Sequence, residues 1–210
     1  MKTRSFLLAA GVMLAMAFTF SCDSGGGDDG GGGGYTGCSG GGSGSTCTDF
    51  KTKKIGEQTW MAENLNCDVG VSKCYADDPA CCAKYGRLYD WSTALTACPS
   101  GWHLPSNAEW DALMTAVGGS GTAGTKLKAT SGWNDDGNGT DDYEFSALPG
   151  GNGNSGGGSF SNVGYYGRWW SATEGLSDYA IIRYMDYSGS YVRTDYGGES
   201  YLFSVRCVQD

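Results

Sequence analysis

The side chains best suited to chemistry are concentrated in residues 133–142, which read WNDDGNGTDD. Carboxylate and amide oxygens come from Asn134, Asp135, Asp136, Asn138, Asp141 and Asp142. Calcium takes about six to eight oxygen ligands from flexible loops of this kind, although the residue order of an EF-hand and its closing Glu are missing. The stretch is a candidate calcium site. The alternative is a solvated turn, since Asp, Asn and Gly are common turn formers.

A second candidate surface is aromatic and follows the same glycine-rich region. Tyr165, Tyr166 and Trp169 are the candidate ligand-binding residues, because aromatic faces stack on sugar rings and anchor protein contacts. The neighbouring Trp170 is expected in the core. Six further tyrosines lie on the expected strands: Tyr179, Tyr184, Tyr187, Tyr191, Tyr196 and Tyr201. Because alternate strand residues point to opposite faces, about half of these six are expected to be structural.

Nucleophilic catalysis needs a base within reach of a serine or cysteine, and the chain has one histidine, His103. It lies in SGWHLPSNAEW, residues 100–110. In that stretch Ser106 and Glu109 form a capping box: the serine oxygen accepts a first-turn N–H, and the glutamate accepts the serine N–H. The stretch is therefore expected to have a structural role. No catalytic residue is predicted.

Two helices are expected to flank this stretch. The first carries apolar residues on one face from Trp91 to Cys98, and Pro99 ends it by disfavouring the α conformation of the preceding residue. The second has the same spacing from Trp110 to Val117, and glycines at 118 and 119 stop it. A long irregular region, residues 120–168, follows.

Strands are expected at both ends of the domain. Residues 50–61 suit a hairpin that turns at Gly56 and Glu57. From Trp169 onward the pattern changes to strands, with a second hairpin around Ser188 and Gly189 and a final strand that places Phe203 on its apolar face.

The N-terminus indicates export. Residues 1–21 combine two early basic residues with an apolar run of about fifteen residues, which is typical of a secretory signal peptide. Cys22 follows and is a candidate lipidation site, with ordinary secretion as the alternative. Residues 22–47 are glycine-rich and suit a flexible tether to a single domain over residues 48–210. The net charge of −9 argues against nucleic acid as a partner and leaves the lipid as the only membrane contact.

The cysteines fit an oxidising compartment. There are nine, so lipidation of Cys22 would leave an even number for disulfides. A zinc site is the alternative, but no CxxC motif is present. The preferred pairs are Cys74–Cys82, Cys67–Cys81 and Cys38–Cys47, which would pin a cysteine-dense loop over residues 66–85 and close a small loop in the tether.

Six blocks in order resemble the major paralogous domain family first described in Fibrobacter succinogenes. They are KIGEQTWMAENLN, YGRLYDWSTAL, CPSGWHLPSNAEWDAL, FSALPGG, WWSATE and FSVRCVQD. The match covers essentially the whole domain, from about Lys53 to Asp210. The resemblance implies no established biochemical activity.

More distantly, DWSTALTACPSGWHLPSNAEW and the terminal VRCV are similar to C-type lectin-like domains. That likeness implies an α+β fold, with two helices on a twisted, mostly antiparallel sheet, a long irregular loop region and a disulfide between Cys98 and Cys207. The same block resembles formylglycine-generating sulfatase modifiers. Those enzymes use a C-terminal cysteine pair, whereas Cys207 is the only cysteine after Cys98, so the likeness does not carry catalysis over. The lectins' Glu-Pro-Asn calcium motif is also missing.

The expected function is that of an exported, non-catalytic binding or adhesion module on the outer membrane or cell surface. Its ligand would be a glycan or another cell-envelope component, bound around residues 133–170, with calcium as a possible cofactor. Two alternatives are a structural envelope lipoprotein without a small ligand and an enzyme of the sulfatase-modifier type.

Overall fold

The computed structural model describes Cys38 and residues 47–156 and 158–210, which belong to one compact unit, residues 35–210. The expected signal peptide (1–21) and the candidate lipidation site Cys22 lie outside the described residues. Of the expected tether, residues 22–47, the structure describes only Cys38 and Cys47.

The fold is α+β, as expected, but the described residues contain four α-helices where the sequence predicts two. They are α1 (Pro79–Tyr85), α2 (Trp91–Ala97), α3 (Asn107–Ala116) and α4 (Ser120–Leu127), preceded by a 3-10 turn, η1 (Tyr75–Asp77). In the described part of the chain, no helix has the length and apolar character of a membrane span.

The strands form two sheets. The smaller one has the order β1 (Thr52–Ile55), β2 (Gln58–Met61), β12 (Val208–Gln209) and β5 (Trp102–His103). The larger one has the order β10 (Arg193–Gly198), β9 (Tyr179–Asp186), β8 (Tyr166–Glu174), β11 (Tyr201–Ser204), β4 (Leu88–Tyr89) and β3 (Ser72–Lys73). At its side, β6 (Asn152–Asn154) pairs with β11 and with β7 (Phe160–Ser161). The named strands pair antiparallel, except that β8 runs parallel to β11.

Both expected hairpins are present. β1 and β2 pair around Gly56, whose positive φ of 61° suits a tight turn. β9 and β10 pair as well, but residues 187–192 connect them, so the turn is longer than the expected Ser188-Gly189 step. β8 begins at Tyr166, three residues before the expected start of the strand region.

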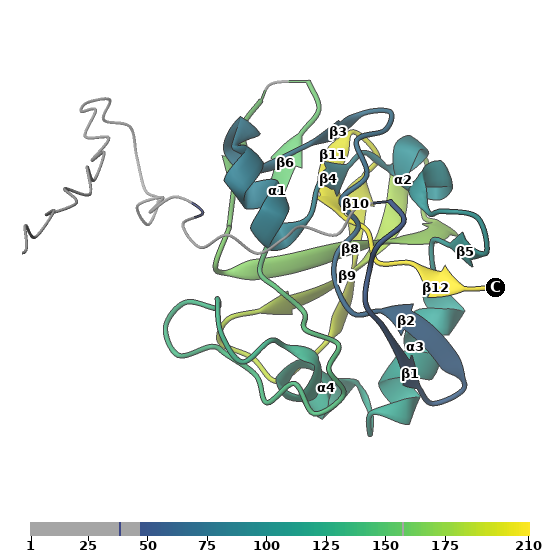
Figure 1. The fold of residues 1–210 in the computed structure, drawn as a ribbon, viewed down its shortest axis with the longest axis vertical. Helices are drawn as coiled ribbons and strands as arrows, with labels where there is room; N and C mark the ends of the chain where they lie inside the picture. The colour runs from purple at the N-terminus through teal and green to yellow at the C-terminus, as the bar shows by residue number, and fades with distance from the viewer. Residues whose placement is uncertain (1–37, 39–46, 157) are drawn as a thin grey trace, which may run out of the picture. The chain divides into compact units, whose positions relative to one another are not determined.

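The larger sheet is covered on both faces. In Figure 1, α1 and α2 lie on one side of β8 and β9, and α3 and α4 lie on the other. Because adjacent strand residues point to opposite faces, Trp169 packs with Trp60 and Trp110 on one side of β8, and Trp170 packs with Phe203 on the other. Both β8 indoles are fully buried, which confirms the expected core position of Trp170.

The corner between α2 and α3 follows its sequence signals. Asp90 caps α2 by accepting the Thr93 N–H at 2.9 Å, and the helix ends just before Cys98 and Pro99. Ser106 and Glu109 form both bonds of the predicted capping box at the start of α3. The stretch 100–110 therefore forms the N-terminal cap of α3, which confirms the expected structural role of this part.

Two helices lie where loops were expected, and each depends on local chemistry that apolar spacing does not reveal. α1 occupies the cysteine-dense loop; Asp78 caps it by accepting the Ala80 N–H at 2.9 Å, and Pro79 is its first residue. α4 begins the region 120–168 and contains Gly124. A Cβ atom there would lie 2.7 Å from the backbone oxygens of Ser190 and Tyr191, so only glycine permits this packing.

Four disulfides join the described cysteines, and the structure corrects two of the expected pairings. Cys74–Cys82 is formed as predicted, and Cys98–Cys207 links the end of α2 to the C-terminal strand region as the resemblance implied. The other pairs are Cys38–Cys81 and Cys47–Cys67, so the expected Cys38–Cys47 and Cys67–Cys81 bonds were wrong. Both tether cysteines are therefore cross-linked to the domain itself.

Candidate functional site

A buried polar cluster lies at the centre of the domain and was not foreseen from the sequence. Trp169 donates from its indole N–H to Oδ1 of Asn64 at 2.8 Å, and Arg206 donates to the same oxygen from Nη2 at 2.8 Å. Arg206 also donates to the backbone oxygen of Phe145 and packs over its ring. Complete burial lowers the pKa of Arg206 to about 9. These contacts link four segments that are far apart in the sequence, so the cluster has a structural role.

His103 lies between two carboxylates. Its Nε2 is 2.7 Å from Oε1 of Glu109, and its Nδ1 is 2.7 Å from Oδ1 of Asp210. Ser106 Oγ donates to Glu109 at 2.8 Å rather than to the imidazole. Both ring nitrogens are thus occupied, and neither can take a proton from Ser106. The cluster fastens the C-terminus to the start of α3.

Two of the six oxygen-bearing residues in the stretch 133–142 accept hydrogen bonds that fix the local backbone. Asp141 accepts the Ser146 N–H at 2.7 Å and its hydroxyl at 2.8 Å, while Asn138 accepts the Trp133 N–H at 3.0 Å. Among the residues that the structure describes, no three acidic, histidine or cysteine side chains are grouped so that they could hold a metal ion. The structure therefore gives the candidate calcium site no support.

The candidate ligand residues 165, 166 and 169 do not form one exposed surface. Trp169 is fully buried and bonded to Asn64, so its assignment as a ligand residue was wrong. Tyr165 is half-buried against Tyr187, with ring centres 5.2 Å apart, and Tyr166 is half-buried beside Arg168. The alternation of residues along the strand could not predict the burial of Trp169, because both faces of β8 are covered and residues 169 and 170 are both in the core.

The exposed aromatic side chains gather elsewhere, around the turns that follow β8 and β10. The large apolar side chains that solvent reaches there form what we call the tyrosine patch: Leu176 (76 % exposed), Tyr179 (48 %), Tyr196 (56 %) and Tyr201 (43 %). A Cβ atom built on Gly198 would lie 3.2 Å from the Tyr201 ring and 3.9 Å from the Tyr179 ring. Gly198 thus lies between these two rings.

A second glycine brings Tyr196 into the same patch. A Cβ atom on Gly175 would lie 2.8 Å from both the Tyr196 ring and the backbone oxygen of Tyr179. In addition, the Tyr179 N–H donates to the Leu176 oxygen at 2.9 Å, which fixes the turn. The patch therefore stands on hydrogen-bonded strands and turns, and two glycines let its rings lie close to the backbone.

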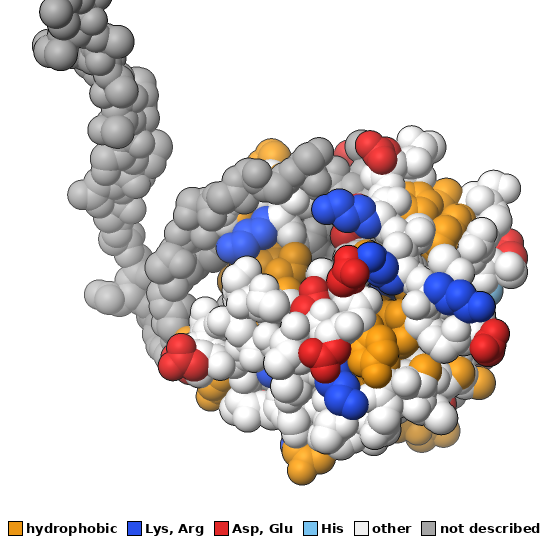
Figure 2. All heavy atoms as spheres, turned by 60° about the horizontal axis from the view of Figure 1, so that its bottom comes forward, with side chains coloured by type: hydrophobic (Ala, Val, Ile, Leu, Met, Phe, Trp, Pro, Cys, Tyr) orange, Lys and Arg blue, Asp and Glu red, His pale blue; other side chains and the backbone are white. Residues whose placement is uncertain are grey.

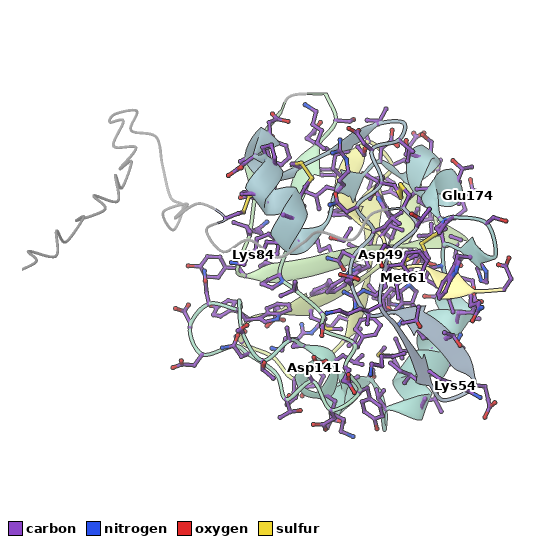
Figure 3. All side chains as sticks on the ribbon, viewed as in Figure 1. Asp49, Lys54, Met61, Lys84, Asp141 and Glu174 are labelled. Atoms are coloured by element: carbon purple, nitrogen blue, oxygen red, sulfur yellow. A yellow bond between two sulfur atoms is a disulfide. The ribbon has the colours of Figure 1, made fainter. Side chains whose placement is uncertain are left out.

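The patch is separate from the oxygen-rich stretch. Figure 3 labels Asp141, beside α4, and Glu174, the last residue of β8, and the two lie far apart in that view. The tyrosines of the patch were identified from the sequence as strand residues. What the sequence did not reveal is that strand pairing brings residues 176, 179, 196 and 201 together.

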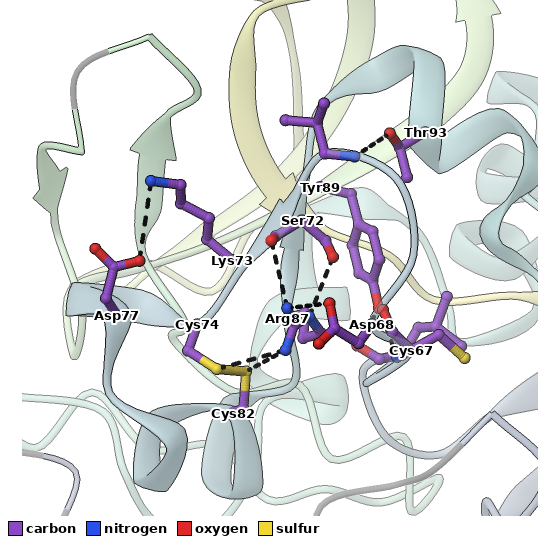
Figure 4. A network of polar contacts seen from close by, with 12 residues as sticks. Cys67, Asp68, Ser72, Lys73, Cys74, Asp77, Cys82, Arg87, Tyr89 and Thr93 are labelled. Atoms are coloured by element: carbon purple, nitrogen blue, oxygen red, sulfur yellow. Dashed lines mark hydrogen bonds and ion pairs between the residues drawn. A yellow bond between two sulfur atoms is a disulfide. The ribbon is translucent and has the colours of Figure 1, made fainter.

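The cysteine-dense segment is held by one largely buried cation (Figure 4). Arg87 donates to Asp68 at 2.5 Å and to the Ser72 hydroxyl at 3.1 Å, and its Nη1 lies 3.8 Å from both sulfurs of Cys74–Cys82. Its bonds are all internal to this segment, which indicates a structural role.

The charges are mixed on the surface that Figure 2 shows. Basic and acidic side chains are interspersed there, so this face presents no continuous basic field for a polyanion such as nucleic acid.

Comparison with known proteins identifies the family of the chain. No curated protein and no solved structure matches it. Residues 54–209 match the model of the Fibrobacter succinogenes major domain, which takes in the tyrosine patch, the buried cluster around Arg206 and the helix corner. The chain belongs to the Fibrobacter succinogenes major domain family.

Proposed function

We propose that the chain is an exported, non-catalytic module that binds carbohydrate through the tyrosine patch. The exposure of four large apolar side chains on hydrogen-bonded strands and turns carries this proposal. Large apolar side chains that gather in one exposed area are typical of interaction sites on soluble domains. Tyrosine suits a sugar, because its flat face covers the apolar face of the ring and its hydroxyl can bond to sugar hydroxyls.

The non-catalytic part of the proposal has two supports. Each of the eight described cysteines is in a disulfide, whereas a modifier-type enzyme needs a reactive thiol. His103 has both nitrogens beside carboxylates, so it is poorly placed to activate a serine.

The lectin-like relationship is likewise a proposal. It is supported by the Cys98–Cys207 bond, by the α2–α3 corner and by the pairing of the β1–β2 hairpin with the C-terminal β12. Four disulfides favour folding outside the cytoplasm. We propose a lipid on Cys22 as the anchor to the outer membrane or cell surface. The Cys38–Cys81 bond would then attach the proposed tether to the domain at Cys38.

A glycan array tests this function. The full-length chain should bind a defined set of glycans, and EDTA should leave the signal unchanged, because the proposed surface contains no metal site. A Tyr196→Ala variant should lose the signal. The absence of any bound glycan for the wild-type chain would contradict the proposal and favour the structural envelope role.

A further inference from the structure

A cluster of one arginine and two tyrosines lies on β8 and β9. Arg168 follows Tyr166 by two residues on β8 and is paired with Tyr184 on β9. Because alternate residues of a strand share a face and paired residues lie side by side, the three side chains lie on one face of the sheet. The Arg168 guanidinium is 4.5 Å from the centre of the Tyr166 ring, and the two tyrosine ring centres are 6.3 Å apart. We call these three half-buried residues the Arg168 cluster.

The Arg168 guanidinium is held in place without being neutralised. Its Nη1 donates to Oδ1 of Asn152, which is buried and also accepts a hydrogen bond from the Asn162 side chain at 2.9 Å. The Tyr166 ring adds a cation–π contact to the same guanidinium. These partners are uncharged, and within the described residues no carboxylate forms an ion pair with Arg168. The cation is therefore ordered before any anion binds, which lowers the entropic cost of binding.

Arg168 also has donors that solvent reaches. Its Nε and Nη2 have no hydrogen-bond partner in the described part of the chain. Neither nitrogen is among the buried side-chain atoms that lack a partner, so both are accessible. These two nitrogens carry the parallel N–H donors along one edge of the guanidinium, and such a pair matches the two oxygens of a carboxylate.

The charges near the Arg168 cluster favour a single negative charge. Burial lowers the pKa of Arg168, against the opposing effects of the two tyrosines and Asp195. Asp195 thus acts on the guanidinium, but no ion pair joins the two in the residues that the structure describes. Asp186, which is paired with Tyr166, accepts the Ser188 N–H at 3.0 Å and its hydroxyl at 2.8 Å. One cation among these acids suits a monoanion better than a dianion.

The short strand β6 connects the Arg168 cluster to one residue of the tyrosine patch. Tyr201 is paired with Asn154 of β6, and the Arg168 partner Asn152 lies two residues away on the same strand. Side chains at residues 152 and 154 share a face and are about 7 Å apart along the strand. Paired residues also share a face, so Tyr201 and Arg168 approach the same side of β6.

A second chain of contacts leads to the same placement. Tyr201 stacks on Phe203, with ring centres 6.0 Å apart, and Phe203 packs on Trp170, with ring centres 4.7 Å apart. Trp170 follows Arg168 by two residues on β8, so its side chain is on the face of the Arg168 cluster. Tyr201 and Arg168 therefore lie on one face, within reach of a single oligosaccharide.

We propose that the Arg168 cluster is a carboxylate subsite, in which Nε and Nη2 of Arg168 bind the acid group of a carboxylated sugar while a neighbouring sugar of the same chain stacks on Tyr201. This inference rests on the proposed carbohydrate-binding function. It adds a charged subsite to that function and names the chemical class of the ligand.

Calorimetry with tetragalacturonate and with its methyl ester tests the subsite on the full-length chain. The acid form should bind about tenfold more tightly than the ester, because the ester lacks the charged acceptor. Arg168→Gln should weaken binding of the acid form to the level of the ester and leave binding of the ester unchanged. Lys54→Gln removes an exposed positive charge from β1 in the smaller sheet and should change neither affinity.

A second variant keeps the test decisive if Arg168→Gln does not fold, which thermal unfolding would reveal. Arg168→Lys retains the positive charge but not the pair of parallel donors. It should therefore lose most of the preference for the acid form over the ester. A full tenfold preference in Arg168→Lys, or in folded Arg168→Gln, would overturn the assignment of the carboxylate to Arg168.

The remaining outcomes separate the subsite from the proposed function. Equal binding of acid and ester to the wild-type chain, both weakened by Tyr196→Ala, would overturn the subsite and leave the proposed function standing. Equally tight binding of a sulfated neutral tetrasaccharide would overturn the choice of a carboxylate. Binding of neither galacturonate form would overturn the inference as well, and the glycan array would then decide the proposed function separately.

Discussion

Oδ1 of Asn64 accepts a hydrogen bond from Nη2 of Arg206 at 2.8 Å, across a sequence separation of 142 residues. The arginine is fully buried and the asparagine nearly so. Asn64 also donates to the backbone oxygen of Tyr85 at 2.8 Å. This pair joins the segment after β2, the end of α1 and the C-terminal region, and so holds the sheet framework that carries the tyrosine patch.

Replacement of Arg206 tests this cluster. Arg206→Met should lower the free energy of unfolding by about 2–4 kcal/mol, because the backbone oxygens of Phe145 and Ser146 lose their donor in the interior. Arg206→Lys should not restore stability, since an ammonium group lacks the planar fork that reaches several acceptors. Urea unfolding measures both. Lys53→Met, which removes only the exposed Lys53–Glu144 ion pair, is the control and should cost less than about 1 kcal/mol. Equal losses for the exposed and buried variants would contradict the assignment.

His103 should make stability depend on pH. Burial lowers its pKa, but hydrogen bonds to Asp210 and Glu109 outweigh this, so the pKa is raised above 6.5. Burial likewise opposes ionisation of Glu109, yet hydrogen bonds from Ser106 and His103 lower its pKa below 4.5. The stability that His103 contributes is therefore full below pH 6.5 and is lost as pH rises through its higher folded-state pKa. The stability that Glu109 contributes is present above pH 4.5 and is lost as pH falls through its lower folded-state pKa.

Unfolding measured across neutral pH checks the histidine term. The wild-type chain should lose stability as pH rises through this range, and His103→Gln should show a flatter profile, because the chain has no other histidine. Identical pH profiles for the two proteins would show that the imidazole pairs contribute nothing.

Gly124 and Gly121 offer a matched pair of substitutions in α4. Gly124→Ala should destabilise the fold by about 1–3 kcal/mol, because its Cβ would lie 2.7 Å from two backbone oxygens. Gly121→Ala meets nothing nearer than 3.9 Å and should stabilise by up to about 1 kcal/mol through helix propensity. Thermal unfolding should therefore shift in opposite directions. A shift in the same direction for both would mean that α4 is not packed against residues 190 and 191.

The disulfides should differ in their contribution to stability. Cys98–Cys207 spans 109 residues and Cys74–Cys82 spans 8. Removal of the first pair by double alanine substitution should cost about 4–5 kcal/mol, and removal of the second about 2–3 kcal/mol, if unfolded-state entropy dominates. Urea unfolding compares the two variants. An equal or larger loss for the short loop would rule out that explanation.

Local signals in the sequence were enough for the elements whose residues are close together. The capping box at Ser106 and Glu109, the turn at Gly56 and the stop at Pro99 each depend on a few neighbouring residues, and the structure confirms them. The general α+β class followed from these elements and from the family resemblance.

Features that depend on distant residues could not be read in the same way. Cys81 and Cys82 are adjacent, and which partner each takes depends on the direction of α1, which the sequence did not predict. Trp169 and Trp170 look alike as aromatic residues, and only the helices on both sides of β8 make both of them core. The tyrosine patch likewise exists only because the turns after β8 and β10 meet.

Binding of a neutral glycan selected on the array, measured by calorimetry, tests the central claim most directly. Tyr179→Ala and Tyr196→Ala should each weaken binding at least about tenfold, because exposed aromatic rings at the centre of an interface supply much of its energy. Tyr191→Ala removes a tyrosine that is 49 % exposed but lies outside the patch, and it should bind like the wild type. Wild-type affinity in both patch variants, or an equal loss in Tyr191→Ala, would contradict carbohydrate binding by the tyrosine patch.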